Sequence, residues 1–278
     1  MSAPQLFPII LPSETQSREF DGKLLLAGLL AKRGHPVYVG SRIEIHNRIY
    51  TLPRGLYLAK DVRPSSRRMF RIMDQLGFAI AAWDEEAIIV TDVETFHKRR
   101  VDPESLSHIK AFFAQGAKNR QIMETAPGYR DTPIYETGNP RFDMLGPRCR
   151  QFFDPQVKAL RDRFGEFILI NTNFGSLNHV LPNQAAVRTA SGAFKNLAAG
   201  TDEWWTFRLE VLNAFKAMLP ELGRAFPDRQ IVLRPHPGEG LKIWQEAAQG
   251  LPNITVVHEG NVYPWILASA VAIHNGCT

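Results

Sequence analysis

The chain has 278 residues, which is enough for two domains of ordinary size. Hydrophobic residues make up 44% of it and charged residues 22%, so we expect a sizeable core and exclude a disordered chain. The formal net charge of +5 suits an anionic ligand or an anionic membrane surface, but Lys and Arg form no dense block, which disfavours nucleic-acid binding.

The sequence contains no clear targeting or membrane-spanning signal. The two cysteines, Cys149 and Cys277, form neither a CxxC pair nor a zinc-site spacing, and they fit a reducing, cytoplasmic setting. The first ten residues lack a basic start and a long apolar core, so we expect no signal peptide. No apolar run approaches the ~20 residues of a membrane span, so any contact with the inner membrane is expected to be peripheral.

The N-terminal part of the chain begins with a predicted strand, helix and strand. The first strand covers 6–10, the helix covers 18–33, and the second strand covers 37–39. Gly34 is a natural C-terminal cap for this helix. The apolar residues that give the helix its spacing are Phe20, Leu24, Ala27 and Leu30.

The same alternation continues through the first half of the chain. A helix is predicted over 67–76, and the strands predicted after it cover 78–82, 111–114 and 134–137. Strands that alternate with amphipathic helices are typical of an α/β fold with parallel sheets. We therefore predict an N-terminal Rossmann-like domain over residues 1–150.

A charged segment at 144–165, which contains glycine and prolines, predicts a boundary before a second Rossmann-like domain over 165–278. A long polar loop is predicted at 176–200. The predicted strands of this domain are 167–170, 231–233, 254–257 and 271–273, and its predicted helices are 203–226 and 241–248. The apolar spacing of the first of these helices comes from Trp204, Phe207, Val211, Phe215, Met218 and Leu222.

The chain stops directly after its last predicted strand. In a Rossmann-like unit a helix should follow such a strand. We therefore expect the second domain to be incomplete, with at least one further helix in the complete protein.

The turn after the strand 231–233 reads RPHPGE. In open α/β sheets, ligands bind beyond the carboxyl ends of the strands. The two prolines stiffen the turn and orient His236, Arg234 supplies a forked cation, and the helix after Glu239 offers free N–H groups. Together these features could hold a phosphate, although a rigid strand-to-helix turn is the alternative.

Two further strand ends could contribute to the same site. The turn after 271–273 contains Gly276, which permits close approach of a ligand, and Thr278, which could cap a following helix. The turn at 171–175 carries asparagines that could recognise a base or a sugar, or simply form a turn. The candidate substrate-binding residues of these two turns are Asn173, Phe174, Gly175, His274, Asn275, Gly276 and Thr278.

Charged residues also follow two strands of the first domain. Glu14 and Arg18 lie where the first strand meets its helix, and acidic residues there are equally expected from the helix dipole. Asp84 and Glu86 follow the strand 78–82. They could form a solvated turn, or one of them could serve as a general base.

Asp143 is the remaining candidate for a catalytic group. It lies in the sequence GNPRFD after the last strand of the first domain, where it could act as a nucleophile or base with Arg141 as its partner. A structural cap is the alternative reading of Asp143.

Several established motifs are missing. The histidines form no HExxH or similar group, so we predict no metal site. No GxGxxG follows the first strand and no GxxxxGK[ST] occurs, which disfavours NAD binding and P-loop chemistry. No cofactor is predicted.

Several segments together resemble the bacterial surface carbohydrate biosynthesis protein family across nearly the whole chain. They are LPSETQSREFDGKLLLAGLLAKRGHPVYVGSR, AAWDEEA, TGNPRFD, INTNFG, RPHPGE and the terminal HNGCT. The RPHP turn also resembles that of capsule enzymes of the β-Kdo transferase and glycerophosphotransferase type. More distantly, the arrangement is similar to that of GT-B sugar-nucleotide epimerases.

The resemblance implies a GT-B-like fold with an active site in the cleft between the domains. It implies that the first domain is the acceptor side and that the second domain holds the nucleotide donor. Arg234, His236 and Glu239 match the donor-side turn, and His274, Asn275 and Thr278 match a second phosphate-facing turn. His236 is our candidate for a catalytic group that stabilises the departing phosphate. In the β-Kdo transferases the donor is a CMP-sugar and a carboxylate of the first domain acts on the sugar. Asp143 is our candidate for that carboxylate, with Asp84 and Glu86 behind it.

Three functions follow from these observations. The first is a metal-independent glycosyltransferase that uses a CMP- or UDP-sugar to extend a glycan or a lipid-linked acceptor in surface polysaccharide synthesis. The second is an enzyme resembling sugar-nucleotide 2-epimerases, which needs no acceptor. The third is a non-catalytic partner that binds a nucleotide or a glycan.

Overall fold

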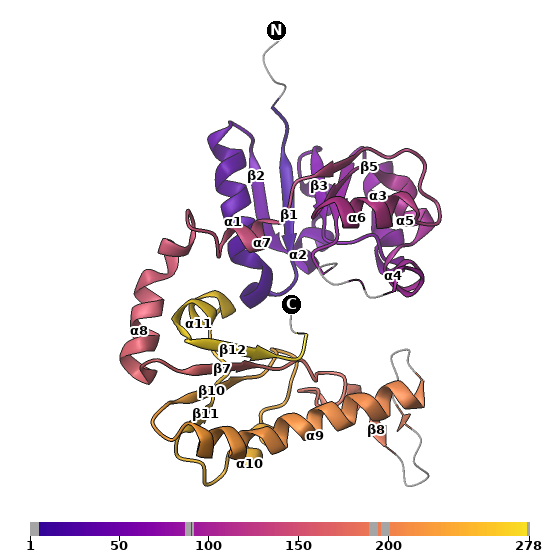
Figure 1. Ribbon diagram of the computed structural model, residues 1–278. Helices are drawn as coiled ribbons and strands as arrows, with labels where there is room; N and C mark the ends of the chain where they lie inside the picture. The colour runs from indigo at the N-terminus through magenta and orange to yellow at the C-terminus, as the bar shows by residue number, and fades with distance from the viewer. Residues whose placement is uncertain (1–5, 87–89, 91, 189–193, 196–200, 277–278) are drawn as a thin grey trace. The chain divides into compact units, whose positions relative to one another are not determined.

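The computed structural model describes residues 6–86, 90, 92–188, 194–195 and 201–276. The chain divides into two compact units, Met1–Cys149 (unit 1) and Arg150–Thr278 (unit 2), shown in Figure 1. Within the described parts of both units, no helix has the length and apolar character that crossing a membrane requires.

Unit 1 is built on a six-stranded parallel sheet in the order β2-β1-β3-β4-β5-β6. Its strands are β1 (Ile9–Ser13), β2 (Val37–Ser41), β3 (Leu56–Ala59), β4 (Ala79–Trp83), β5 (Ile109–Ala114) and β6 (Ile134–Glu136). Its helices are α1 (Gln16–Lys32), α2 (Arg42–Asn47), α3 (Arg67–Gln75), α4 (Val93–Arg100), α5 (Pro103–His108), α6 (Ala117–Glu124) and α7 (Pro140–Asp143). The α/β class with parallel sheets that the sequence predicts is confirmed.

The strands of unit 1 are apolar on both faces because helices cover both. On one face, strand residues such as Ile10 and Ile80 pack with side chains from α2 to α6. On the other, Leu11 and Ala81 pack against α1. This explains why β1, IILPS, is buried along its whole length.

Helix α1 differs from its prediction in the face that it buries. Leu24 was expected to pack inward, but it is 46% exposed, whereas Glu19, Gly22 and Lys23 are buried. The two charged residues can be buried because they pair with other charges, as described below. Gly22 is buried because α7 packs closely there: a Cβ at position 22 would lie 3.2 Å from the backbone nitrogen of Arg141. A template that counts only apolar residues therefore misplaces the buried face.

Unit 2 contains a four-stranded parallel sheet in the order β11-β10-β7-β12. Its strands are β7 (Ile168–Asn171), β10 (Ile231–Arg234), β11 (Ile254–Val256) and β12 (Val271–His274). Its helices are α8 (Asp154–Phe164), α9 (Asp202–Ala225), α10 (Lys242–Ala247) and α11 (Val262–Ala268). Within the predicted loop 176–200, β8 (Val187–Arg188) and β9 (Phe194–Lys195) form a short antiparallel pair.

Both faces of the second sheet are also covered. Ile170 and Leu233 pack with α9 and α10, while Leu169 and Val232 pack with α8 and α11. Helix α9 buries Trp205, Leu212, Leu219 and Gly223 most deeply. The prediction that Trp204 and Phe207 face the core is wrong, since they are 41% and 59% exposed. Helix α9 carries apolar residues on several sides, so the spacing of these residues alone does not identify its buried face.

Candidate functional site

Three turns of unit 2 lie along one edge of its sheet. Strand β7 pairs with β10 on one side and with β12 on the other, so that Asn171 is opposite both Arg234 and His274. Since the strands are parallel, the turns after β10, β7 and β12 leave the sheet at the same edge. The turns 234–239 and 274–276 therefore flank the turn that follows β7.

Hydrogen bonds connect these three turns. The Asn173 N–H donates to Asn275 Oδ1 at 2.7 Å, which joins the β7 turn to the β12 turn. The Thr172 hydroxyl donates to Glu239 Oε1 at 2.9 Å, which joins the β7 turn to the β10 turn. The three turns thus hold one another in place.

The histidines of the two outer turns adopt the same local geometry. His236 Nδ1 accepts the Gly238 N–H at 3.0 Å, and His274 Nδ1 accepts the Gly276 N–H at 3.1 Å. A backbone N–H can only donate, so each Nδ1 must be unprotonated and the neutral ring carries its proton on Nε2. In both rings Nδ1 is thus used within the turn, and Nε2 is the nitrogen that carries the proton.

A third histidine near this edge was not among the residues singled out in the sequence. The backbone of His179 pairs with that of Glu239 in an isolated antiparallel β-bridge. His179 Nδ1 accepts the N–H of Leu181, two residues ahead, at 3.0 Å. Its Nε2 lies near Gly238, since a Cβ built there would be 4.0 Å away. The predicted loop around His179 gave no sign of this return to the sheet edge.

Arg208 of α9 was also missed. Its guanidinium donates to the Asn173 carbonyl at 2.5 Å and lies over the Phe174 ring, 5.3 Å from its centroid. The prediction for this helix used only the spacing of its apolar residues. The Arg208 contact depends on how α9 packs against the turn after β7.

Several predicted ligand-binding residues of unit 2 have structural contacts. Glu239 is buried and accepts hydrogen bonds from Thr172, from the His236 N–H and from Trp244 Nε1. The Phe174 side chain lies in the core, so Phe174 can offer a ligand only its backbone. The buried Arg234 donates to the carbonyls of Glu259 and Gly260 and so ties β10 to the loop after β11.

The other predicted residues of this edge remain available to a ligand in different degrees. Asn173 and Gly175 are half-buried, Asn275 is half-buried, and His274 and Gly276 are exposed. Thr278 lies outside the described residues.

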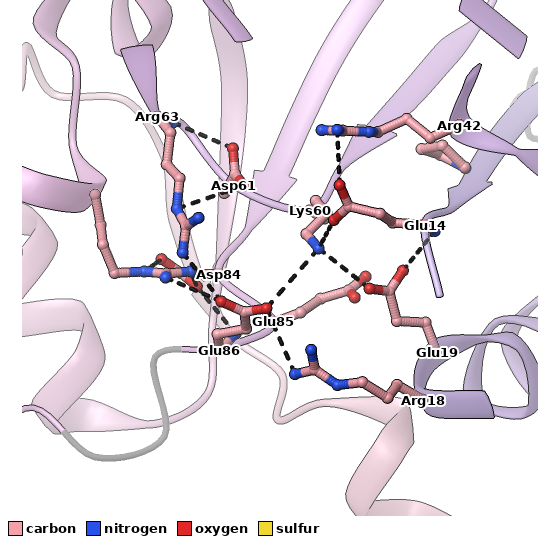
Figure 2. A network of polar contacts seen from close by, with 12 residues as sticks. Glu14, Arg18, Glu19, Arg42, Lys60, Asp61, Arg63, Asp84, Glu85 and Glu86 are labelled. Atoms are coloured by element: carbon pink, nitrogen blue, oxygen red, sulfur yellow. Dashed lines mark hydrogen bonds and ion pairs between the residues drawn. The ribbon is translucent and has the colours of Figure 1, made fainter. Parts of the chain in front are cut away.

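The corresponding edge of unit 1 holds a network of charged side chains, shown in Figure 2. Its members follow β1, β3 and β4 or lie on helices nearby. The acidic members are Glu14, Glu19, Asp61, Asp84, Glu85 and Glu86, and the basic ones are Arg18, Lys23, Arg42, Lys60, Arg63 and Arg100. The two signs are equal in number, so the network is electrically balanced.

Two buried lysines organise the centre of this network. Lys23 Nζ lies 2.8 Å from Glu85 Oε1 and 3.6 Å from Glu19 Oε2. Lys60 Nζ lies 3.1 Å from Glu19 Oε1 and also pairs with Glu14. Burial would raise the pKa of Glu19, but the Glu14 N–H and the two lysines outweigh it and hold that pKa below its usual value.

The predicted carboxylates Asp84 and Glu86 both belong to this network. Burial raises the pKa of Asp84 to about 7, while its two-pronged contact with Arg100 favours the ionised form. Glu86 is more exposed and pairs with Arg18 at 3.5 Å, Arg63 at 3.0 Å and Arg100 at 3.1 Å. The structure thus brings Glu14, Arg18, Asp84 and Glu86 together.

Asp143 has a different setting in unit 1. It is exposed at the end of α7 and lines a largely apolar cavity of about 360 Å³ between α1 and the sheet. Leucines of α1, Trp83 and Phe113 form much of the lining. Arg141, next but one in the chain, donates to the Glu85 carbonyl at 3.2 Å. Asp143 is therefore an accessible carboxylate at the edge of an apolar space.

No group of three or more histidines, cysteines or acidic residues suited to a metal ion occurs within the described ranges. What the described edges offer a ligand is therefore a set of side-chain and backbone hydrogen-bonding groups together with charged side chains.

The solved structures of two proteins are similar in fold to this protein over nearly its whole chain. The S. aureus MnaA structure with UDP has a TM-score of 0.52 and 11% identity, over 97% of this chain and 73% of the MnaA chain. A structure of the wall teichoic acid polymerase TagF with CDPG has a TM-score of 0.51 and 10% identity, over 99% of this chain and 66% of the TagF chain. No protein-family model and no curated protein matches the chain.

At such low identity the likeness bears on the fold alone. Both units have parallel sheets covered by helices on each face, as expected for Rossmann-like domains. The chain therefore has a GT-B-like α/β fold built from two Rossmann-like units.

Proposed function

We propose that the protein is a glycosyltransferase-like enzyme of bacterial surface polysaccharide synthesis. It transfers a sugar from a CMP- or UDP-linked donor to a glycan or a lipid-linked acceptor. Unit 2 binds the donor and unit 1 faces the acceptor. The observation that carries this proposal is the edge of β10, β7 and β12, where the turns of His236 and His274 flank the β7 turn and the exposed His274 ring carries its proton on Nε2.

Such an edge suits the phosphate of a nucleotide-sugar. Donors that are already oriented stabilise the negative charge that develops on a departing phosphate without having to reorganise. The two imidazoles are oriented by the N–H groups of Gly238 and Gly276, which donate to their Nδ1 atoms. The proposal invokes no metal ion, because these donors meet the charge of the leaving group.

We assign the carboxylate role in unit 1 to Asp143. It is exposed, so it can reach a sugar, and the apolar cavity beside it suits the lipid part of an acceptor. Asp143 would act as base or nucleophile. Asp84 and Glu86 are the second candidates for this role in the proposal. Their salt bridges with Arg100 suit the positioning of other groups better than direct contact with a sugar.

The comparisons support the proposal at the level of ligand class. The MnaA structure contains UDP, and TagF is described as a wall teichoic acid polymerase. We extend both features to this chain as part of the proposal. The enzyme would work in the cytoplasm, with peripheral contact to the inner membrane.

Nucleotide binding tests the donor site. We expect the chain to bind UDP or CMP in isothermal titration calorimetry, and His236→Ala to weaken binding about tenfold, as loss of one charge-assisted hydrogen bond predicts. His236→Asn can still accept the Gly238 N–H but lacks the distal donor, so it should weaken binding equally. His108→Asn in unit 1, where the ring contacts Asp74, is the matched control.

Turnover then separates the possible activities. We expect release of nucleotide from a CMP- or UDP-sugar only when an acceptor glycan or lipid extract is present, and loss of this release in Asp143→Asn. Turnover without acceptor would indicate an epimerase instead. Tight nucleotide binding with no turnover under any condition would indicate a binding protein.

A further inference from the structure

Unit 1 contains a second cavity, which the proposed donor site does not use. It has a volume of about 390 Å³ and lies beside α2, the end of β3 and the start of α3. The polar residues that line it are Arg42, His46, Tyr57, Lys60, Ser65, Ser66 and Arg68. Among the described residues, its lining includes three cations and no carboxylate.

Arg68 supplies the charge that is left for a ligand. Arg42 pairs with Glu14 at 2.7 Å, and Lys60 pairs with Glu14 and Glu19, so both of these cations are largely neutralised from behind. Arg68 is exposed at the second position of α3 and has no ion-pair partner within the described chain. A ligand with negative charge would give it one.

The backbone at the start of α3 is already hydrogen-bonded. A 3₁₀ turn over Pro64–Ser66 runs directly into the helix, and the Arg67 N–H donates to the Pro64 carbonyl. The Ser66 hydroxyl donates to Asp61 Oδ1 at 3.0 Å. Arg68 is therefore the group that would receive the anionic end of a ligand.

The opposite wall offers neutral hydrogen-bonding groups. His46 Nε2 and the Tyr57 hydroxyl lie 2.7 Å apart. Burial, with Arg42 nearby, lowers the pKa of His46 to about 4, and burial raises that of Tyr57, so both are uncharged at neutral pH. Neutral donors and acceptors of this kind suit sugar hydroxyls, and Phe70 and Met69 supply an apolar surface.

We propose that this cavity binds a small anionic sugar, with its phosphate or carboxylate group on Arg68 and its hydroxyl groups on Ser65 and the His46–Tyr57 pair. The volume falls within the usual range for small-molecule sites, and the lining combines one charged end with a neutral wall. This site is separate from the nucleotide site proposed for unit 2.

Titration of the full chain tests the proposal. Glucose 6-phosphate and glucuronate represent the two anionic groups, and glucose is the neutral control. We expect saturable binding of at least one anionic sugar, with an affinity that falls as salt concentration rises. Glucose should bind far more weakly. Failure of both anionic sugars to bind up to about 10 mM would overturn the proposal.

Variants show whether binding occurs in this cavity. Arg68→Ala should weaken anionic-sugar binding about tenfold or more. Arg71→Ala is the matched control, because Arg71 lies on the same helix but pairs with Glu104 outside the cavity. An equal loss in both variants would mean nonspecific attraction to a basic surface and would contradict the proposal.

Two further measurements sharpen the result. Tyr57→Phe should weaken binding of glucose 6-phosphate but not of orthophosphate, and equal binding of the two ligands by the unmodified chain would mean a plain anion site and no sugar site. UDP binding should be unchanged in Arg68→Ala. Failure of this inference is thereby distinguishable from failure of the donor site, which His236→Ala probes.

Discussion

The carboxyl edges of the two sheets hold different kinds of side chain. In unit 1, acids and bases neutralise one another, as Lys23 does with Glu19 and Glu85. In unit 2, the edge carries imidazoles, asparagines and two arginines that donate to backbone carbonyls, and its central acid, Glu239, accepts hydrogen bonds from three donors. The charged side chains of the first edge thus pair with one another, whereas hydrogen bonds join the turns of the second edge.

This difference separates the charged residues that build an edge from the residues that can serve a ligand. A buried ion pair contributes little net stability, but removal of one partner leaves an uncompensated charge and is strongly destabilising. At the unit 2 edge, His274→Asn removes the Nε2–H donor but keeps an acceptor for the Gly276 N–H, so it should cost the fold little stability. Substitutions at the two edges should therefore separate stability from binding.

The largest effect should come from the centre of the unit 1 network. Lys23→Met leaves Glu19 and Glu85, both buried, without their shared cation, and should destabilise unit 1 by about 3–5 kcal/mol. Hydrogen exchange of peptides covering β1 and β4 measures this. Lys158→Met, which removes an exposed pair with Asp162, should change stability by less than about 1 kcal/mol. Similar small effects for both variants would mean that the network does not hold the edge together.

The next largest effect concerns the acid of the unit 2 edge. Glu239→Ala leaves donors of Thr172, His236 and Trp244 without their acceptor and should destabilise unit 2 by about 2–4 kcal/mol. Urea denaturation followed by tryptophan fluorescence reports this change. Glu246→Ala, an exposed residue that pairs with Lys242 at 3.8 Å, should have almost no effect. If Glu239→Ala proved equally mild, the acid would not be needed to join the turns.

The stability of unit 1 should depend on pH through His46. The pKa of His46 is about 4 in the folded state and about 6.5 in an unfolded chain, so the unfolded state takes up a proton first as pH falls. Stability is therefore lost from about pH 6.5 down to pH 4, by about 1–2 kcal/mol after allowance for partial exposure. His46→Gln should flatten this part of the stability curve of unit 1, measured by hydrogen exchange. An unchanged slope would contradict it.

The smallest effect tests a helix start near the unit 2 edge. Asn261 caps α11 by accepting the Tyr263 N–H at 3.1 Å. Asn261→Ala should cost about 1 kcal/mol in thermal or urea unfolding, and Asn261→Asp, which can still accept that bond, should cost less. The reverse order of the two variants would show that capping is not the role of Asn261.

Much of the fold could be predicted from the sequence because strands and helices leave local patterns. The strand prediction 134–137 and β6 (Ile134–Glu136) nearly coincide, and Gly34 does follow α1 with a positive φ of 95°. Strand β3 was not predicted, since LYLA is short and follows no clear signal. Burial on a given helix face was the weakest prediction, because it depends on neighbours that a local pattern does not reveal.

The candidate sites could be predicted only in part for the same reason. Acids after strands, such as Asp84 and Glu86, were visible as a pattern, but their cationic partners were not. Lys60, Arg63 and Arg100 reach them only because β3 lies beside β4 and α4 returns to the sheet edge. Likewise, the contact of Arg208 with the β7 turn required the packing of α9.

The central place of β7 has a consequence for how the chain folds during synthesis. Its partners are β10, which begins at Ile231, and β12, which begins at Val271. Both flanks of this early strand stay open until the ribosome has made those distant segments. Unit 1, whose last strand ends at Glu136, can fold well before then. A stall in translation after β7 and before β10 would thus leave a folded unit 1 attached to an unpaired, aggregation-prone β7.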